Sequence, residues 1–80
     1  MPTLRLFAAA REVAGTGREV VRGATVGEVL ADARERYGTA FGAVLARSRV
    51  WVNGEPALDD TPVADLDEVA VLPPVSGGTD

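Results

Sequence analysis

Few folds accommodate a single amphipathic helix placed in the middle of an 80-residue chain, between two groups of β-type segments. Thr25 and Glu28 are spaced as in a capping box, which starts a helix, and Gly38 marks the end of the helical pattern. Between these positions one apolar stripe recurs at helical spacing, and it consists of Val26, Val29, Leu30, Ala33 and Tyr37. A helix with one apolar side must bury it against another element, so the flanking segments are expected to form a sheet.

The segments before this helix predict a hairpin and a short helix. Residues 3–7 alternate with period two, which predicts a strand whose Leu4 and Leu6 face the core. Residues 8–14 are rich in alanine and are followed by a glycine, which is typical of a short helix. Residues 19–21 predict a second strand, which pairs most simply with the first.

The segments after the helix predict a second short helix and three further strands. Residues 40–46 carry apolar residues at helical spacing. Residues 49–55 contain Asn-Gly, which readily adopts a type I′ turn and predicts a hairpin, with a short return strand at residues 57–58. Residues 68–72 are rich in β-branched side chains, which predicts a central position for the last strand.

This order of elements predicts an α+β fold of the β-grasp, or ubiquitin-like, type. A first hairpin, a crossover helix and a last strand that returns beside the first describe such a roll. We expect a mixed sheet of four to five strands, with one long helix and one or two short ones. The fold alone does not give the function, because β-grasp domains have many.

Composition excludes several classes of function. The chain has no histidine and no cysteine, which excludes the usual transition-metal sites, nucleophilic Cys/His pairs and disulfides. Lysine is absent too, so all eight basic residues are arginines. A net charge of −4 argues against nucleic acid as a partner. No apolar run approaches the roughly 20 residues of a membrane span, and no secretion signal opens the chain. We therefore expect a cytoplasmic protein.

The last residues of the chain have an unusual composition. Pro73 and Pro74 lack backbone donors and hold the chain extended, so the preceding strand is expected to end there. Gly77 and Gly78 follow, and a segment without Cβ atoms can pass through a channel too narrow for other residues.

We therefore divide the chain into a β-grasp domain at residues 1–73 and a flexible tail at residues 74–80. The tail suits insertion of a terminal carboxylate into the active site of another protein. A frayed terminus without a function is the alternative that the residues leave open.

Short motifs spread over nearly the whole chain are similar to the motifs of a known protein family. They are Leu6-Phe7-Ala8 followed by Arg11-Glu12, Thr25-Val26 before the long helix, Val52-Asn53 before the hairpin turn, Asp67-Glu68-Val69 before the last strand, and the terminal Pro73-Pro74-Val75-Ser76-Gly77-Gly78. With these motifs the chain resembles the MoaD/ThiS family of sulfur-carrier proteins, and especially the small subunit of molybdopterin synthase. Thiamin-pathway carriers also end in Gly-Gly but usually lack the double proline, which favours the molybdopterin type.

The resemblance implies a mechanism and partners. In the family, an adenylyltransferase related to ubiquitin-activating enzymes uses ATP to form an acyl-adenylate at the terminal glycine. A sulfur donor then converts this acyl group to a thiocarboxylate, which delivers sulfur to an acceptor such as the large synthase subunit. Mapped onto this chain, Gly78 carries the reactive carbonyl and Gly77 gives clearance in the channel. The reach of the tail is set by Pro73, Pro74, Val75 and Ser76. The chain is then a carrier and co-substrate without turnover or a bound cofactor of its own.

One departure from the family pattern concerns the last two residues. Thr79 and Asp80 follow Gly78, whereas the working family tail ends at glycine. Three explanations compete: a protease removes the two residues, a tolerant partner acts on the longer end, or the chain has kept binding and lost carrier function. We favour processing, because the prolines and glycines of the tail remain in place. Processing also favours a dedicated carrier, for example for a natural product or for cysteine synthesis.

An apolar docking patch is predicted near the root of the tail. Trp51 alternates with Val50 and Val52, which are expected to face the core, so Trp51 is expected to point to the other face of the sheet. Phe7 and Leu72 alternate with core-facing residues of their own strands in the same way, so all three side chains are expected on the sheet face away from the helices. Arg5 shares that face and could meet acidic groups of a partner. The alternative is that a loop or Pro73 covers the three side chains.

Three hypotheses for the function remain open at this point. The first is a sulfur carrier, most of all for molybdopterin, with another thio-metabolite such as a natural product, cysteine or thiamin next. The second is a ubiquitin-like binding module whose tail is never activated. The third is a protein tag that is conjugated to lysines of other proteins.

Overall fold

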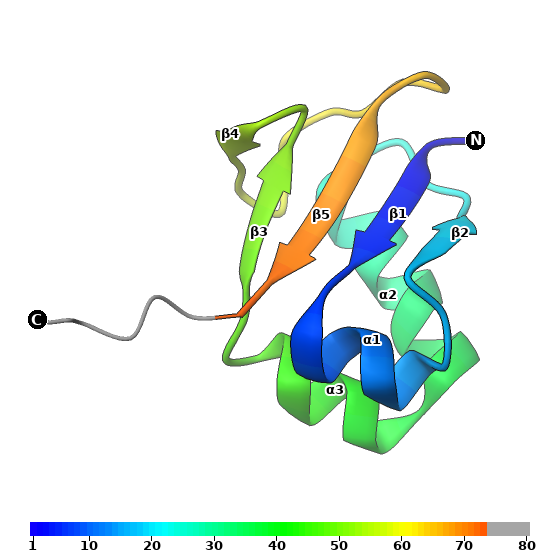
Figure 1. Cartoon of the computed structure of the whole chain (residues 1–80). Helices are drawn as coiled ribbons and strands as arrows, with labels where there is room; N and C mark the ends of the chain where they lie inside the picture. Colours follow the sequence, from blue (N-terminus) through cyan, green and yellow to red (C-terminus); the bar gives the residue numbers. More distant parts are fainter. Residues whose placement is uncertain (74–80) are drawn as a thin grey trace, which may run out of the picture.

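The order of strands and helices along the chain is that of the predicted roll (Figure 1). A computed structural model describes residues 1–73, and the tail predicted at residues 74–80 lies outside them. The elements are β1 (Thr3–Leu6), α1 (Ala8–Ala14), β2 (Arg18–Val20), α2 (Val26–Tyr37), α3 (Thr39–Leu45), β3 (Arg49–Val52), β4 (Glu55–Pro56) and β5 (Glu68–Leu72). The long helix α2 crosses behind the sheet, and α1 and α3 lie along its lower end in this view (Figure 1).

The five strands form one mixed sheet in the order β2-β1-β5-β3-β4. β5 pairs parallel with β1 and antiparallel with β3, and the other pairs are antiparallel. β5 is therefore the central strand, as its β-branched composition predicted. The predicted β-grasp fold, with its mixed sheet, one long helix and two short ones, is confirmed.

The return strand of the second hairpin was predicted at the wrong residues. The prediction placed it at residues 57–58, whereas β4 is Glu55–Pro56. Asn53 and Gly54 have φ angles of 51° and 85°, which is the positive φ at both central positions of a type I′ turn. A two-residue turn of this type brings the next residue straight into register, so Glu55 pairs with Val52. β2 and α3 each begin one residue earlier than predicted.

The amphipathic helix α2 begins as its capping box predicts. Thr25 Oγ1 accepts a hydrogen bond from the Glu28 N–H at 3.2 Å, and Glu28 Oε1 accepts from the Ala24 N–H at 2.8 Å. The chain enters the helix through Gly23, where a Cβ would lie 2.7 Å from the Val29 backbone nitrogen. Only glycine therefore permits this close approach of the β2–α2 connection to the helix.

The core lies between α2 and the inner face of the sheet and is closed below by α1 and α3. Phe41 of α3 is fully buried and is the largest side chain in it, and the Tyr37 ring packs 5.1 Å from its ring centre. Alternate residues of β1 and β5 supply the sheet side of the core, as period two requires. The buried apolar residues are Leu4, Leu6, Ala10, Val21, Val26, Val29, Leu30, Ala33, Phe41, Leu45, Val69 and Val71.

A polar clamp joins the second hairpin to the start of the central strand. Asn53 Oδ1 accepts from the Glu68 N–H at 2.9 Å, and Asn53 Nδ2 donates to Asp67 Oδ1 at 2.9 Å. Asp67 Oδ2 in turn accepts from the Ala64 N–H at 2.8 Å. The bond from Ala64, and then that from Asn53, lower the pKa of the Asp67 carboxyl because both stabilise its charged form.

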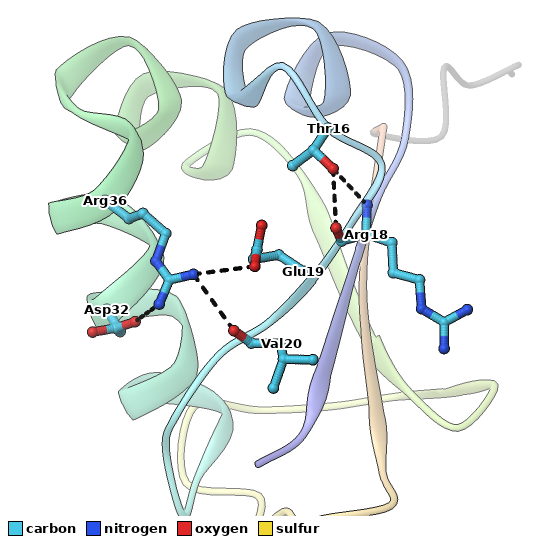
Figure 2. Close-up of polar contacts among 6 residues, drawn as sticks. All are labelled: Thr16, Arg18, Glu19, Val20, Asp32 and Arg36. Carbon is cyan, nitrogen blue, oxygen red and sulfur yellow. Dashed lines mark hydrogen bonds and ion pairs between the residues drawn. The ribbon is translucent and has the colours of Figure 1, made fainter.

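The free edge of β2 is occupied by side chains of the same molecule (Figure 2). Thr16 Oγ1 donates to the Arg18 carbonyl at 2.9 Å and accepts from the Arg18 N–H at 3.3 Å. Arg36 of α2 donates to the Val20 carbonyl at 3.4 Å. Its guanidinium is also held at 3.2 and 3.6 Å by the carboxylates of Asp32 and Glu19. These groups take the backbone positions with which a further strand would pair.

Substituting Thr25 tests the cap of α2. In Thr25→Ala the Glu28 N–H loses its acceptor, and we expect the free energy of unfolding to fall by about 1 kcal/mol. Urea denaturation measures this change. Thr39→Ala is the control, because α3 has no side-chain cap, and it should change the free energy by less than about 0.5 kcal/mol. Equal losses in the two variants would contradict the role of the cap.

The lowered pKa of Asp67 predicts a specific acid sensitivity. A carboxyl whose folded-state pKa lies below its unfolded value contributes stability that is present above the ordinary Asp pKa of about 4. This contribution is lost as the pH falls through that value and then through the folded pKa. In urea denaturation between about pH 6 and about pH 3, we expect wild type to lose more stability than Asp67→Asn. The control Asp60→Asn should lose as much stability as wild type over this pH range. If Asp67→Asn also lost as much stability as wild type, the role given to the Asp67 carboxylate would be refuted.

Candidate functional site

One face of the sheet, here called the open face, is not covered by any helix within residues 1–73. The strand register defines it, because Leu4, Leu6, Val69 and Val71 point into the core and their neighbours point away. Arg5, Ala70 and Trp51 lie side by side across three strands. The open face comprises Thr3, Arg5, Phe7, Arg18, Val20, Arg49, Trp51, Pro56, Glu68, Ala70 and Leu72.

The three residues predicted as a docking patch all belong to the open face. The Phe7 side chain is 36% exposed, and Trp51 and Leu72 are half-buried. Leu72 pairs with Arg49 and Trp51 with Ala70, so Trp51 and Leu72 occupy diagonal positions of neighbouring strands. The Phe7 N–H donates to the Val71 carbonyl at 3.3 Å, which holds Phe7 beside the end of β5. The structure therefore places Phe7 and Leu72 at one end of the open face, with Trp51 diagonal to Leu72.

Ala70 is a member of this surface that the sequence prediction did not select. It lies between Arg5 and Trp51 in the centre of the open face. Its side chain is much smaller than those of its two cross-strand neighbours. The period-two pattern of residues 68–72 contained this information, because it assigns Ala70 to the same side as Leu72.

Arg5 is anchored on the open face by two neighbours. Its Nη1 donates to Glu68 Oε2 at 3.2 Å, and its guanidinium lies 5.6 Å from the centre of the Phe7 ring. A cation at this distance from an aromatic ring is attracted to its face. Arg5 therefore contacts both Phe7 and Glu68 and links the apolar patch to the charged part of the open face.

The root of the tail lies at the Phe7 end of the open face. β5 ends at Leu72, and Pro73, which follows, is exposed. Pro73 and Phe7 border one small cavity of about 70 Å³, together with Val44 and Ser48. Pro73 is thus adjacent to Phe7, but more than a third of the surface of Phe7 stays exposed. The other predicted site residues, Pro74, Val75, Ser76, Gly77 and Gly78, lie outside the described residues.

The comparison with known proteins decides the family. The ThiS family model matches residues 4–78. The chain belongs to the ThiS family. It is a small sulfur-carrier protein of the ThiS/MoaD type. The family match ends at Gly78, so Thr79 and Asp80 lie beyond it.

Several solved structures resemble this ThiS-family protein over nearly its whole length. SAMP1 from Haloferax volcanii is 37% identical, with a TM-score of 0.76 and coverage of 95% of this chain and 97% of that one. A protein of the BexX/CysO complex from Amycolatopsis orientalis is 25% identical, with a TM-score of 0.80 and coverage of 98% and 100%. A candidate molybdopterin converting factor, subunit 1, from Pyrococcus furiosus is 27% identical, with a TM-score of 0.77 and coverage of 91% and 95%.

In residues 1–73 no group of three or more acidic side chains is placed to hold a metal ion. None of the three helices described is long and apolar enough to cross a membrane.

Substitutions at two adjacent residues distinguish the open face from the core. Leu6 is 1% exposed, and Leu6→Ala should lower the free energy of unfolding by about 2–5 kcal/mol. Phe7→Ala removes a partly exposed ring and its contact with Arg5, for which we expect a loss of about 1 kcal/mol. Thermal and urea unfolding measure both values. A loss for Phe7→Ala as large as that for Leu6→Ala would assign Phe7 to the core instead.

Proposed function

We propose that this protein carries sulfur as a thiocarboxylate on Gly78, after removal of Thr79 and Asp80. The observation that carries the proposal is the family match, which extends through the Gly-Gly pair and ends at Gly78. The chain has no cysteine, so a persulfide cannot be carried on one of its side chains. The terminal carboxylate is then the group available to hold sulfur.

The proposed reaction sequence takes place on a partner enzyme. A ubiquitin-activating-like adenylyltransferase in the cytoplasm joins the Gly78 carboxylate to AMP from ATP and releases pyrophosphate. A sulfur donor then displaces AMP and leaves a thiocarboxylate, which is a soft nucleophile that attacks the acceptor. The chain supplies the reacting carboxylate and binds no ATP itself, so it is a co-substrate rather than an enzyme.

The two parts of the candidate site have separate roles in this proposal. Phe7, Trp51 and Leu72 give the partner an apolar surface at the root of the tail, where aromatic side chains contribute strongly to binding. Pro73 is the last described residue and lies beside this surface. We assign the passage through the channel to Pro74, Val75, Ser76 and Gly77, of which Gly77 leaves room for the adenylate at Gly78.

Molybdopterin biosynthesis is the pathway that we propose first. The double proline before Gly-Gly and the likeness to the Pyrococcus furiosus candidate converting factor support it. The acceptor would then be the large subunit of molybdopterin synthase.

A second candidate is a dedicated carrier for another thio-metabolite, such as a natural product, cysteine or thiamin. The two extra residues after Gly78 and the likeness to a protein of the BexX/CysO complex favour it. The likeness to SAMP1, a modifier protein by name, supports a conjugated tag as a further outcome of the same activation step. A binding module that is never activated is the remaining alternative.

The intact mass of the protein from its native host tests the proposal. We expect a chain without Thr79 and Asp80 whose mass is raised by replacement of one oxygen with sulfur. Trimming by a protease without added sulfur, together with isopeptide bonds to lysines of other proteins, would indicate the tag. A full-length chain under conditions that demand sulfur transfer would refute processing and favour the binding module.

The purified adenylyltransferase provides a matched control for this measurement. A chain that ends at Gly78 should form the acyl-adenylate, and one that ends at Asp80 should react far more slowly. The β-branch of Thr79 and the extra charges of Asp80 fit poorly in a channel suited to glycine. Equal rates for the two chains would show that processing is unnecessary.

A further inference from the structure

The charge of the open face is opposite in sign to the charge of the whole chain. The chain has a formal net charge of −4. The charged side chains of the open face are, by contrast, three arginines and one glutamate, namely Arg5, Arg18, Arg49 and Glu68. A positive surface on a negative molecule orients that surface toward a negative surface of a partner.

Two of these arginines are free to bind a partner. Arg18 and Arg49 are exposed, and within residues 1–73 neither guanidinium has an ion pair or a hydrogen bond. Figure 2 shows the Arg18 side chain extending away from Glu19 and Arg36, which lie on the helix side of β2. Arg5, between them in the sheet, is already paired with Glu68 at 3.2 Å.

The two free arginines lie on opposite sides of the two central strands of the sheet. Arg18 is on β2 and Arg49 is on β3, with β1 and β5 between these strands. Three strand spacings of about 4.8 Å place the two backbones roughly 14 Å apart. The residues between and beside them include Ala70, Trp51 and Leu72. The open face therefore carries apolar side chains and the paired Arg5 and Glu68 on its inner strands, with a free guanidinium on each side.

We propose that the partner of the open face is a protein surface with an apolar centre flanked by carboxylates that pair with Arg18 and Arg49. This inference rests on the proposed function, in which the partner is the adenylyltransferase. Each guanidinium offers a planar set of donors that matches a carboxylate. Because both arginines lie at the exposed rim, they act mainly on the rate and the selectivity of association.

The absence of lysine from the chain makes a direct contact test possible. Carbodiimide coupling joins an amine to a carboxylate that it touches, and wild type has no side-chain amine. Arg18→Lys and Arg49→Lys each add one side-chain amine at the rim of the open face. Arg34→Lys is the matched control, because it adds an amine at an exposed position of α2. With the adenylyltransferase of the same organism as the probe, peptide mass spectrometry should find cross-links from the first two variants to its Asp or Glu residues. None should come from Arg34→Lys.

Charge reversal tests the energetic side of the proposal. The double variant Arg18→Glu, Arg49→Glu should lower the association rate constant at low salt by about tenfold or more. The rate constant of wild type should fall as salt is added, and that of the double variant should not. The control combines Arg22→Glu with Arg34→Glu, which changes the net charge equally but lies off the open face. The control should keep most of the wild-type rate and its salt dependence.

The outcomes separate this inference from the proposed function. If wild type does not bind the adenylyltransferase at all, the proposed partner and this inference both fail. If wild type binds but the reversed variant associates equally fast, and no cross-link starts from position 18 or 49, only this inference is overturned. Circular dichroism of each variant confirms that the compared proteins are folded.

Discussion

The parallel pairing of β1 with β5 is the contact on which the rest of the structure depends. Two parallel neighbours cannot be joined by a tight turn, so the chain between them must cross the sheet. The crossover contains α2, whose apolar stripe covers the inner face and closes the core. The same pairing places Phe7 beside Leu72 and Pro73, and so puts these two members of the apolar patch at the same end of the molecule as the root of the tail.

The sequence predicted those features that local chemistry determines. The cap at Thr25, the end at Gly38 and the turn at Asn53 and Gly54 each depend on residues that are close together in the chain, and the structure agrees with all three. The return strand was misplaced because its position depends on how tightly a type I′ turn closes, which shifts the pairing to Glu55. Strand parity correctly placed Phe7, Trp51 and Leu72 on one face.

Other features depend on contacts between distant segments and were not predictable from local patterns. Asn53 and Asp67 belong to separate motifs, 14 positions apart, and only the fold shows that one binds the other. The charge of the open face likewise arises from Arg18 and Arg49, which are far apart in the chain and become neighbours of one apolar surface through the strand order. The predicted roles of Gly77 and Gly78 lie outside the described residues and remain predictions.

The side chains on the free edge of β2 affect how this protein can meet others. Thr16 and Arg36 occupy backbone groups there, and the opposite edge strand carries Pro56, which has no N–H to donate. A partner is therefore directed to the open face, where contacts are made by side chains and not by a continuous ladder of backbone bonds. Such contacts can form and dissociate without rearranging the sheet. In the function proposed above, the protein passes from an activating enzyme to an acceptor and needs only a short residence on each, and closed sheet edges would suit that role.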